Sequence, residues 1–297
     1  MKNFQIKRIL IPTDFSATGL LALEQGAYLA QASKAELHLF HVVEVPDYVF
    51  SVPDEAVRMD TEETIGKIMQ DKMDQTANDI RTQYGVTVKT LNSVGRILTE
   101  VTDYVKENNI DLIVMGTHGA KGFDEYILGS NANRVVEHAD CPVITVQTKP
   151  RKPGFSEIIL PVDNLLHSRQ KTDYAIELAR LSKARIHILG LLETEDAVEE
   201  GKFNIKLDAV EKEVKDAGLT YVRKIERGNN LATTAMEYAQ RVQGDLIVIL
   251  KEEESRLSGR GLFAKQIVNH SKIPVMSIKP QEGYFESIDL TGNARIY

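Results

Sequence analysis

The chain has little of what defines several protein classes. Among 297 residues there is one cysteine, Cys141, which excludes an intramolecular disulfide framework. No apolar run approaches the roughly 20 residues that span a bilayer, and the amino-terminal residues have no apolar core of a secretory signal. The formal net charge is −7, and no basic stripe alternates with aromatic residues, which argues against nucleic-acid binding. These absences predict a cytoplasmic protein that binds neither membrane nor nucleic acid.

Two common nucleotide motifs are also missing. The sequence contains no G-x-x-x-x-G-K-[ST] phosphate loop and no G-x-G-x-x-G dinucleotide fingerprint. It shows no Ser/His/Asp order, no paired-carboxylate motif and no histidines or carboxylates at metal-ligand spacing. We therefore expect no catalytic residue and no protein-held metal.

Hydrophobic residues make up 42% of the chain and charged residues 27%, as in ordinary globular proteins. The strongest functional signal is the stretch from 111 to 146. Its apolar run, residues 112–115, ends at Gly116 and predicts a strand buried on both faces of a parallel sheet. A helix is expected from Asn131, with Ser130 as its N-cap.

Three glycines connect this strand to the helix: Gly116, Gly119 and Gly129. Glycine lets the backbone approach a ligand closely, and the N–H groups at the start of a helix attract anions. A strand, a glycine loop and a helix start in this order favour a nucleotide-phosphate site. A loop that uses its glycines only for turn geometry is the alternative.

The sequence repeats itself. ILIPTD at 9–14 returns as IILPVD at 158–163, an offset of 149 residues, and DLIV at 111–114 returns at 245–248, an offset of 134. Two tandem copies of one domain follow. The expected division is a first domain over 1–148, a second over 156–280 and a polar tail over 281–297, with a Pro- and Lys-rich linker before residue 156.

Each copy alternates strands with helices, which predicts an α/β fold with a parallel sheet and right-handed crossovers. The first copy carries extra chain between Glu44 and about Thr64, marked as a loop by Pro46 and Pro53. A helix with apolar residues at helical spacing, from Ile65 to Ile80, is expected after it.

These motifs, with their order in the chain, resemble the ATP-binding subclass of the universal stress protein family. The likeness covers both halves of the chain. It implies two tandem open, five-stranded, Rossmann-like parallel-sheet domains with helices on both faces, forming a pseudo-dimer. Such domains commonly pair through their last strands, here residues 143–146 and 275–278, and a further homodimer is possible.

The resemblance also implies a set of ATP-binding residues. Asp14 would contact the base or ribose, Val42 would offer backbone groups to adenine, and the loop glycines with Ser130 would hold the phosphates. The full set is Pro12, Thr13, Asp14, Val42, Met115, Gly116, Gly119, Gly129, Ser130 and Asn131. Structural roles are the alternatives: Asp14 and Ser130 as helix caps, Pro12 as a strand terminator and Val42 as core. Magnesium would arrive with the nucleotide.

The second copy departs from the first at the loop. In the stretch where the first has Gly116 and Gly119, the second has Leu250, Lys251 and three glutamates, 252–254. Aligning the copies also places Leu262 opposite Ser130. Carboxylates near a triphosphate repel it by on the order of 1 kcal/mol each at about 4 Å in water. The sequence therefore predicts one nucleotide site, in the first domain.

The function expected from this resemblance is a stress-response regulator that binds ATP and hydrolyses it slowly or not at all. One alternative is a scaffold or small-molecule carrier with a vestigial nucleotide site. Another is an adenylate-transferring ligase, which ranks last because no catalytic group accompanies the loop.

Overall fold

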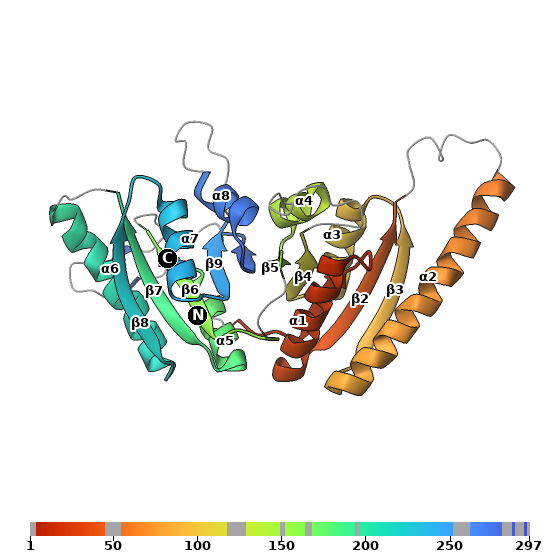
Figure 1. The fold of residues 1–297 in the computed structure, drawn as a ribbon, viewed down its shortest axis with the longest axis horizontal. Helices are drawn as coiled ribbons and strands as arrows, with labels where there is room; N and C mark the ends of the chain where they lie inside the picture. Colours follow the sequence, from red (N-terminus) through yellow and green to blue (C-terminus); the bar gives the residue numbers. More distant parts are fainter. Residues whose placement is uncertain are drawn as a thin grey trace. The chain divides into compact units, whose positions relative to one another are not determined.

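The computed structural model describes residues 4–44, 55–117, 129–148, 152–163, 168–193, 197–251, 262–280, 287–288 and 294–295. For residues 55–66, 197–199, 262, 287–288 and 294–295 it describes the backbone only. The chain divides into two compact units (Figure 1). The first contains residues 5–149, and the second contains residues 150–297 together with residues 1–4.

The first unit is a parallel sheet with strand order β3-β2-β1-β4-β5. Its elements in chain order are β1 (Arg8–Pro12), α1 (Ala17–Ser33), β2 (Glu36–Val43), α2 (Glu55–Tyr84), β3 (Val88–Val94), α3 (Ile97–Asn108), β4 (Leu112–Gly116), α4 (Ser130–His138) and β5 (Val143–Val146).

Helices cover both faces of this sheet. α1 and α2 pack together on one face, α1 against β1 and β4 and α2 against β3. α3 and α4 pack together on the other face, against β2 and β5 respectively. The direction of the connections reverses between β1 and β4, because β1 leads to β2 on one side while β4 lies on the other. The carboxyl ends of β1 and β4 therefore form the topological switch point at which open parallel sheets bind ligands.

The second unit repeats this arrangement, with strand order β10-β9-β6-β7-β8. Its elements are β6 (Glu157–Val162), α5 (Thr172–Ser182), β7 (Arg185–Leu192), α6 (Ala197–Asp216), β8 (Tyr221–Arg227), α7 (Leu231–Arg241), β9 (Leu246–Leu250), α8 (Leu262–His270) and β10 (Val275–Ile278). α5 and α6 cover one face, and α7 and α8 the other. The prediction of two tandem five-stranded α/β domains is confirmed for the described residues.

One expectation about a helix was wrong. α2 begins at Glu55, not after Thr64, and Ile68, one of its apolar residues at helical spacing, is 61% exposed. The later apolar residues of α2, Met73, Ala77 and Ile80, are buried as expected. Within the predicted polar tail over 281–297 the structure describes a short antiparallel pair, β11 (Ser287–Ile288) with β12 (Ala294–Arg295).

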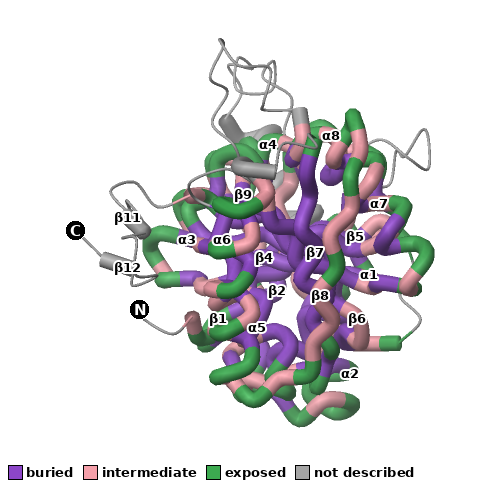
Figure 2. Tube along the Cα trace, turned by 90° about the vertical axis from the view of Figure 1, so that its left-hand side faces the viewer, coloured by how far each residue is buried: buried purple, intermediate pink, exposed green. Residues whose placement is uncertain are grey.

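The central strands carry the core, as the buried colouring of the tube shows (Figure 2). β4 and β9 are almost continuously buried because helices cover both of their faces. Cys141, between α4 and β5, is buried and forms no disulfide.

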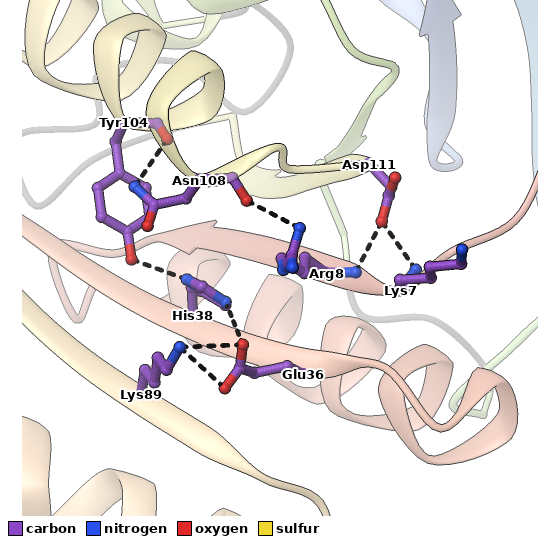
Figure 3. A network of polar contacts seen from close by, with 8 residues as sticks. All are labelled: Lys7, Arg8, Glu36, His38, Lys89, Tyr104, Asn108 and Asp111. Atoms are coloured by element: carbon purple, nitrogen blue, oxygen red, sulfur yellow. Dashed lines mark hydrogen bonds and ion pairs between the residues drawn. The ribbon is translucent and has the colours of Figure 1, made fainter.

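A buried histidine links β2 to α3 (Figure 3). His38 lies 2.7 Å from the Tyr104 hydroxyl through Nδ1 and 3.0 Å from the Glu36 carboxylate through Nε2. Burial lowers the pKa of His38 despite the Glu36 carboxylate beside it, so the ring is neutral at neutral pH. Since a carboxylate only accepts, Nε2 carries the hydrogen and Nδ1 accepts from Tyr104.

The second unit builds the same network with exchanged charges. His187 lies 2.9 Å from the Tyr238 hydroxyl, but its carboxylate partner is Glu157 on the neighbouring strand, at 2.7 Å. Glu157 also receives two hydrogen bonds from Arg185. In the first unit the register partners at this place are Arg8 and Glu36, so acid and base have changed strands. The histidine and its tyrosine are the constant part of the repeat.

An aspartate before the fourth strand ties that strand to the first in both units. The Asp111 carboxylate accepts the backbone N–H groups of Lys7 and Arg8 at 2.8 Å (Figure 3). Asp245 accepts those of Ser156 and Glu157 at 2.8–3.0 Å. This contact aligns the two strands whose opposite ends form the switch point.

Candidate functional site

The candidate site is the carboxyl edge of β1 and β4 in the first unit. The two strands pair in parallel, with Ile9 opposite Leu112, so they end together at Thr13 and Gly116. Thr13 is 6% exposed, and its N–H donates to the Phe40 carbonyl of β2 at 2.8 Å. Pro12 is half-buried and Met115 is buried. Pro12, Thr13, Met115 and Gly116 were predicted to border the site, and the structure brings these four residues together at this edge.

The turn after β1 directs Asp14 into this edge. Asp14 Oδ1 accepts the N–H of Ser16 at 3.0 Å, and Thr13 Oγ1 accepts that of Phe15 at 3.0 Å. Ser16 is the N-cap of α1 and accepts the N–H of Gly19 at 3.2 Å. Asp14 is therefore not the helix cap that one interpretation of the sequence suggested. Its side chain is exposed, and the turn fixes its orientation.

Gly116 is required by close approach rather than by its dihedral angles. A Cβ at this position would lie 2.7 Å from Gly19 N and from the Thr18 carbonyl carbon, and 2.8 Å from Thr18 Oγ1. Two of these atoms belong to backbone, which cannot move aside cheaply. The glycine thus lets the first turn of α1 rest on the end of β4, which joins the α1 side of the site to the β4 side.

The start of α4 is held at the same edge by Thr117. The buried Thr117 accepts the N–H of Gly129 through its carbonyl at 2.7 Å and donates its own N–H to Val146 of β5. Both ends of the 118–128 segment are therefore fixed next to each other. Gly119 lies outside the described residues.

The prediction that Ser130 caps α4 was wrong. Gly129 is the N-cap, and Ser130 is the first helical residue, with an exposed side chain. Gly129 has φ −59°, which any residue can adopt, and its N–H is already bonded to Thr117. A phosphate would therefore meet the next N–H groups of the first turn, at Ser130 and the half-buried Asn131.

Val42 stands where its backbone can meet a ligand. Phe40 is the register partner of Pro12, and its carbonyl accepts Thr13 N–H, so the backbone polar groups of Phe40 face β1. Groups of a parallel strand alternate in direction, and those of Val42 therefore also face the β1 side, beyond the point where β1 ends. The alternative interpretation of Val42 was a core residue, but Val42 is only half-buried.

His41 is not among the site residues predicted from the sequence, yet it contacts the site. Its Nδ1 lies 2.7 Å from the Thr13 carbonyl, and its ring lies 5.8 Å from that of Phe15. Phe15 has a positive φ of 59°, and the Lys72 ammonium of α2 sits 4.2 Å from its ring centroid. The D-x-S pattern that precedes α1 is the sequence signal that could have revealed this turn.

The second unit lacks several of these features. At the repeat offset of 149, Val162 replaces Thr13 and Gly190 replaces His41. α8 begins at Leu262, the residue that aligns with Ser130, the first residue of α4. The glutamates 252–254 lie outside the described residues.

Among the residues that the structure describes, no group of three or more His, Cys, Asp or Glu could hold a metal ion. A search of the same residues finds no helix long and apolar enough to cross a membrane.

The model of the universal stress protein family matches the chain twice, over residues 5–147 and 154–279. The chain belongs to the universal stress protein family. One relative, a universal stress protein of Methanocaldococcus jannaschii, is 32% identical over 149 residues, 49% of this chain and 84% of that protein. The universal stress protein YxiE of Bacillus subtilis is 27% identical over 154 residues, 47% of this chain and 98% of that protein.

Among solved structures, a universal stress protein from Archaeoglobus fulgidus covers 93% of this chain and 99% of its own, with a TM-score of 0.75 and 17% identity. At that identity the likeness concerns the fold. The two family matches establish this chain as a tandem two-domain universal stress protein.

Proposed function

We propose that the first unit of this universal stress protein binds one ATP, with Mg²⁺ carried by its phosphates, and that the chain acts as a stress-response regulator in the cytoplasm. The observation that carries the proposal is the Thr117–Gly129 hydrogen bond of 2.7 Å. It brings the N-terminus of α4 to the carboxyl edge of β1 and β4. An anion-binding helix end thus meets the switch point of an open parallel sheet.

Different residues are proposed to contact different parts of the nucleotide. The backbone of Val42 faces the space beyond β1 and suits the adenine edge, and the oriented carboxylate of Asp14 suits a ribose or base donor. The first-turn N–H groups of α4 suit the phosphates. Pro12, Thr13, Met115 and Gly116 form the floor of the site, and Gly119 belongs to the loop that would complete it. The directions of the backbone groups are fixed by the fold, and the Asp14 carboxylate is oriented by the hydrogen bond that it accepts from Ser16 N–H.

Hydrolysis is proposed to be slow or absent. Phosphoryl transfer to water needs a residue that orients the attacking water and cations that stabilise the transferred group. Of the described residues at this edge, Asp14 is the one carboxylate that directly follows β1 or β4, and this proposal assigns it to the ribose or base. We therefore expect ATP binding to change the surface of the protein and to leave the nucleotide chemically unchanged.

Pairing of the two units through β5 and β10, and a further homodimer, belong to the same proposal. Both strands are fully buried segments of four residues, apolar except for Thr145 and Ser277. Sedimentation of the whole chain with and without ATP would determine whether a homodimer forms and whether the nucleotide controls it.

The test is the thermal shift produced by Mg-ATP in the wild type and in the double variant Gly129→Ala/Ser130→Ala. Alanine fits the φ of −59° at Gly129, so the fold should be retained. The matched control is Gly261→Ala/Leu262→Ala at the corresponding helix start of the second unit. Saturable stabilisation in the wild type and control, absent in the first variant, is expected. Equal stabilisation in all three proteins would refute the site.

The alternative is a small-molecule carrier whose first site is vestigial. The second unit favours it, because that unit has lost Thr13 and His41 equivalents and so presents a different chemistry at its own switch point. A protein with no thermal response to millimolar Mg-ATP would move this alternative to first place.

A further inference from the structure

The strand next to the adenine side of the proposed site carries a polar side chain that the site has not yet used. The proposed nucleotide lies across the ends of β4, β1 and β2, with its base at Val42. The strand beyond β2 is β3, which α2 covers (Figure 1). Asn92 of β3 is the register partner of His41 and so shares its face of the sheet. Since neighbouring strands are only about 4.8 Å apart, the outer edge of a base held at Val42 points to the end of β3.

Hydrogen bonds to α2 fix the orientation of Asn92. The Asp74 carboxylate of α2 accepts hydrogen bonds from Gln70 Nε2 and Thr90 Oγ1, both at 3.0 Å. A carboxylate only accepts, so the Gln70 amide turns its nitrogen to Asp74 and leaves its oxygen for Asn92. Asn92 Nδ2 donates to that oxygen at 2.7 Å. Asn92 Oδ1 is therefore held as an acceptor at the other end of the amide.

This acceptor has no donor. Asn92 Oδ1 is buried, and none of the described residues donates a hydrogen bond to it. A buried acceptor without a partner costs folding free energy, which a well-placed donor recovers. Most buried polar groups in native proteins are paired, and each exception calls for an explanation such as a functional role. Asn92 as a whole is only half-buried, so it lies at the boundary between core and surface.

The second unit fills the corresponding place with apolar side chains. An offset of 133 aligns β8 with β3, and the positive-φ Gly218 after α6 with Gly85 after α2. At this offset Gln70, Asp74 and Asn92 correspond to three apolar residues, Phe203, Leu207 and Ile225. A Cβ at Gly190 would lie within 3.2 Å of each of these three side chains. Apolar packing thus suffices to hold this helix on this strand, and the polar contact in the first unit needs another reason.

We propose that Asn92 determines the base specificity of the ATP site, because its Oδ1 accepts a hydrogen bond from the 6-amino group of adenine. This inference rests on the proposed ATP site and adds the choice of base to it. The amino group has two hydrogens, one for the backbone carbonyl of Val42 and one for Asn92. Guanine and hypoxanthine have a carbonyl at this position and would bring an acceptor against an acceptor that cannot turn. The site therefore selects ATP over GTP and inosine triphosphate.

The experiment is calorimetric titration of the whole chain with the Mg²⁺ complexes of three nucleotides. They are ATP, inosine triphosphate, with a carbonyl in place of the 6-amino group, and purine riboside triphosphate, with a hydrogen there. The wild type should bind ATP most tightly and inosine triphosphate most weakly. Asn92→Leu keeps the size of the side chain and removes the acceptor. Its preference for ATP over purine riboside triphosphate should be lower by roughly five-fold, the worth of one hydrogen bond, and an unchanged preference would overturn the role of Asn92.

Asp74→Asn tests the fixed orientation. Asp74 is exposed, and the exchange keeps its shape but adds an amide that can donate to Gln70. Gln70 and then Asn92 can turn over, and Asn92 Nδ2 can donate to the inosine carbonyl. The preference for ATP over inosine triphosphate should fall by roughly ten-fold. An unchanged preference would overturn the inference.

The matched control is Asp79→Asn, the same exchange at another exposed position of α2. It should keep the preference of the wild type, and a fall equal to that of Asp74→Asn would overturn the inference. Each preference is a ratio measured on one protein, so a change in the folded fraction cancels. Equal affinity of the wild type for all three nucleotides would overturn the role of Asn92 and leave the site in place. No binding of any of the three would overturn both.

Discussion

His41 donates its Nδ1 hydrogen to the Thr13 carbonyl oxygen across 2.7 Å. A carbonyl only accepts, so this contact fixes the imidazole tautomer. It ties β2 to the turn that orients Asp14, and therefore connects the adenine side of the proposed site with the ribose side. Gly190 stands at the same place in the second unit, where a Cβ would lie 3.0 Å from Phe203 and 2.9 Å from Leu207.

Replacing His41 should weaken ATP binding without abolishing it. His41→Leu removes one hydrogen bond, worth about 1 kcal/mol, that holds the turn in place, so the affinity for ATP should fall by no more than roughly five-fold. His41→Asn can place an amide donor near the position of Nδ1 and should recover most of the loss. Titration of the three proteins with Mg-ATP measures this, and identical affinities for the leucine variant and the wild type would contradict the positioning role.

Gly116→Ala should damage both stability and binding. The added Cβ would meet backbone atoms of Thr18 and Gly19 at 2.7 Å, so α1 must shift from β4. Overpacking of this kind costs about 1–3 kcal/mol, and urea unfolding of the variant should show it. Gly95→Ala is the control, because its Cβ would meet only the flexible side chain of Glu100. Equal losses for the two variants would show that the contact is not specific.

The buried His38 should make the protein lose stability in mild acid. Burial lowers its pKa below the ordinary value of 6.5, so the unfolded chain takes up a proton that the folded chain does not. Stability is then complete above pH 6.5 and falls as the pH drops from there toward the lowered pKa. The free energy of unfolding of His38→Gln should decline less than that of the wild type between pH 7.5 and 5.5. A parallel decline in both proteins would disagree with this.

Glu36 adds a separate acid sensitivity. Burial alone would raise its pKa, but the hydrogen bonds from Lys89 and His38 outweigh burial, and the pKa lies below its ordinary 4.5. Its contribution is present above pH 4.5 and is lost as the pH falls through the lowered value. Below pH 4.5, Glu36→Gln should therefore show a shallower decline in unfolding free energy than the wild type. An unchanged slope would mean that Glu36 titrates normally in the folded protein.

Gly201→Ala should stabilise the second unit. Gly201 lies within α6, and a Cβ there would have no heavy atom within 4 Å. Alanine in a helix is favoured over glycine by about 0.5–1 kcal/mol. The midpoint of urea unfolding should rise, while the dependence of the unfolding free energy on urea concentration stays unchanged. A lower midpoint would show that glycine at position 201 has a role other than avoiding a steric clash.

Much of the fold follows from the sequence because buried parallel strands read as continuous apolar runs. The run before Gly116 and its repeat at 246–250 became β4 and β9, and the two offsets predicted the tandem units. Helix ends were less predictable. Ser130 resembles an N-cap, but the Thr117–Gly129 hydrogen bond starts the helix one residue earlier. That contact joins the end of β4 to the start of α4 across residues 118–128, and local spacing gives no sign of it.

The sequence predicted which positions border the site, but not which hydrogen bonds join them. Asp14 and Val42 lie at strand ends, which apolar periodicity locates. His41 was missed because its role depends on a carbonyl of another strand. The start of α2 was predicted too late, and Ile68 is exposed. Helical spacing shows which residues share one side of a helix, but not how much of the helix the sheet covers. The burial of Lys171 was not predicted either, because the repeat alignment alone does not show that α5 begins at Thr172.

The most direct test of the account is calorimetric titration of the whole chain with Mg-ATP. The account predicts one ATP per chain, with binding lost in Gly129→Ala/Ser130→Ala and retained in Gly261→Ala/Leu262→Ala. Two ATP molecules per chain, or binding that survives the first pair of substitutions and disappears with the second, would contradict a single site in the first unit.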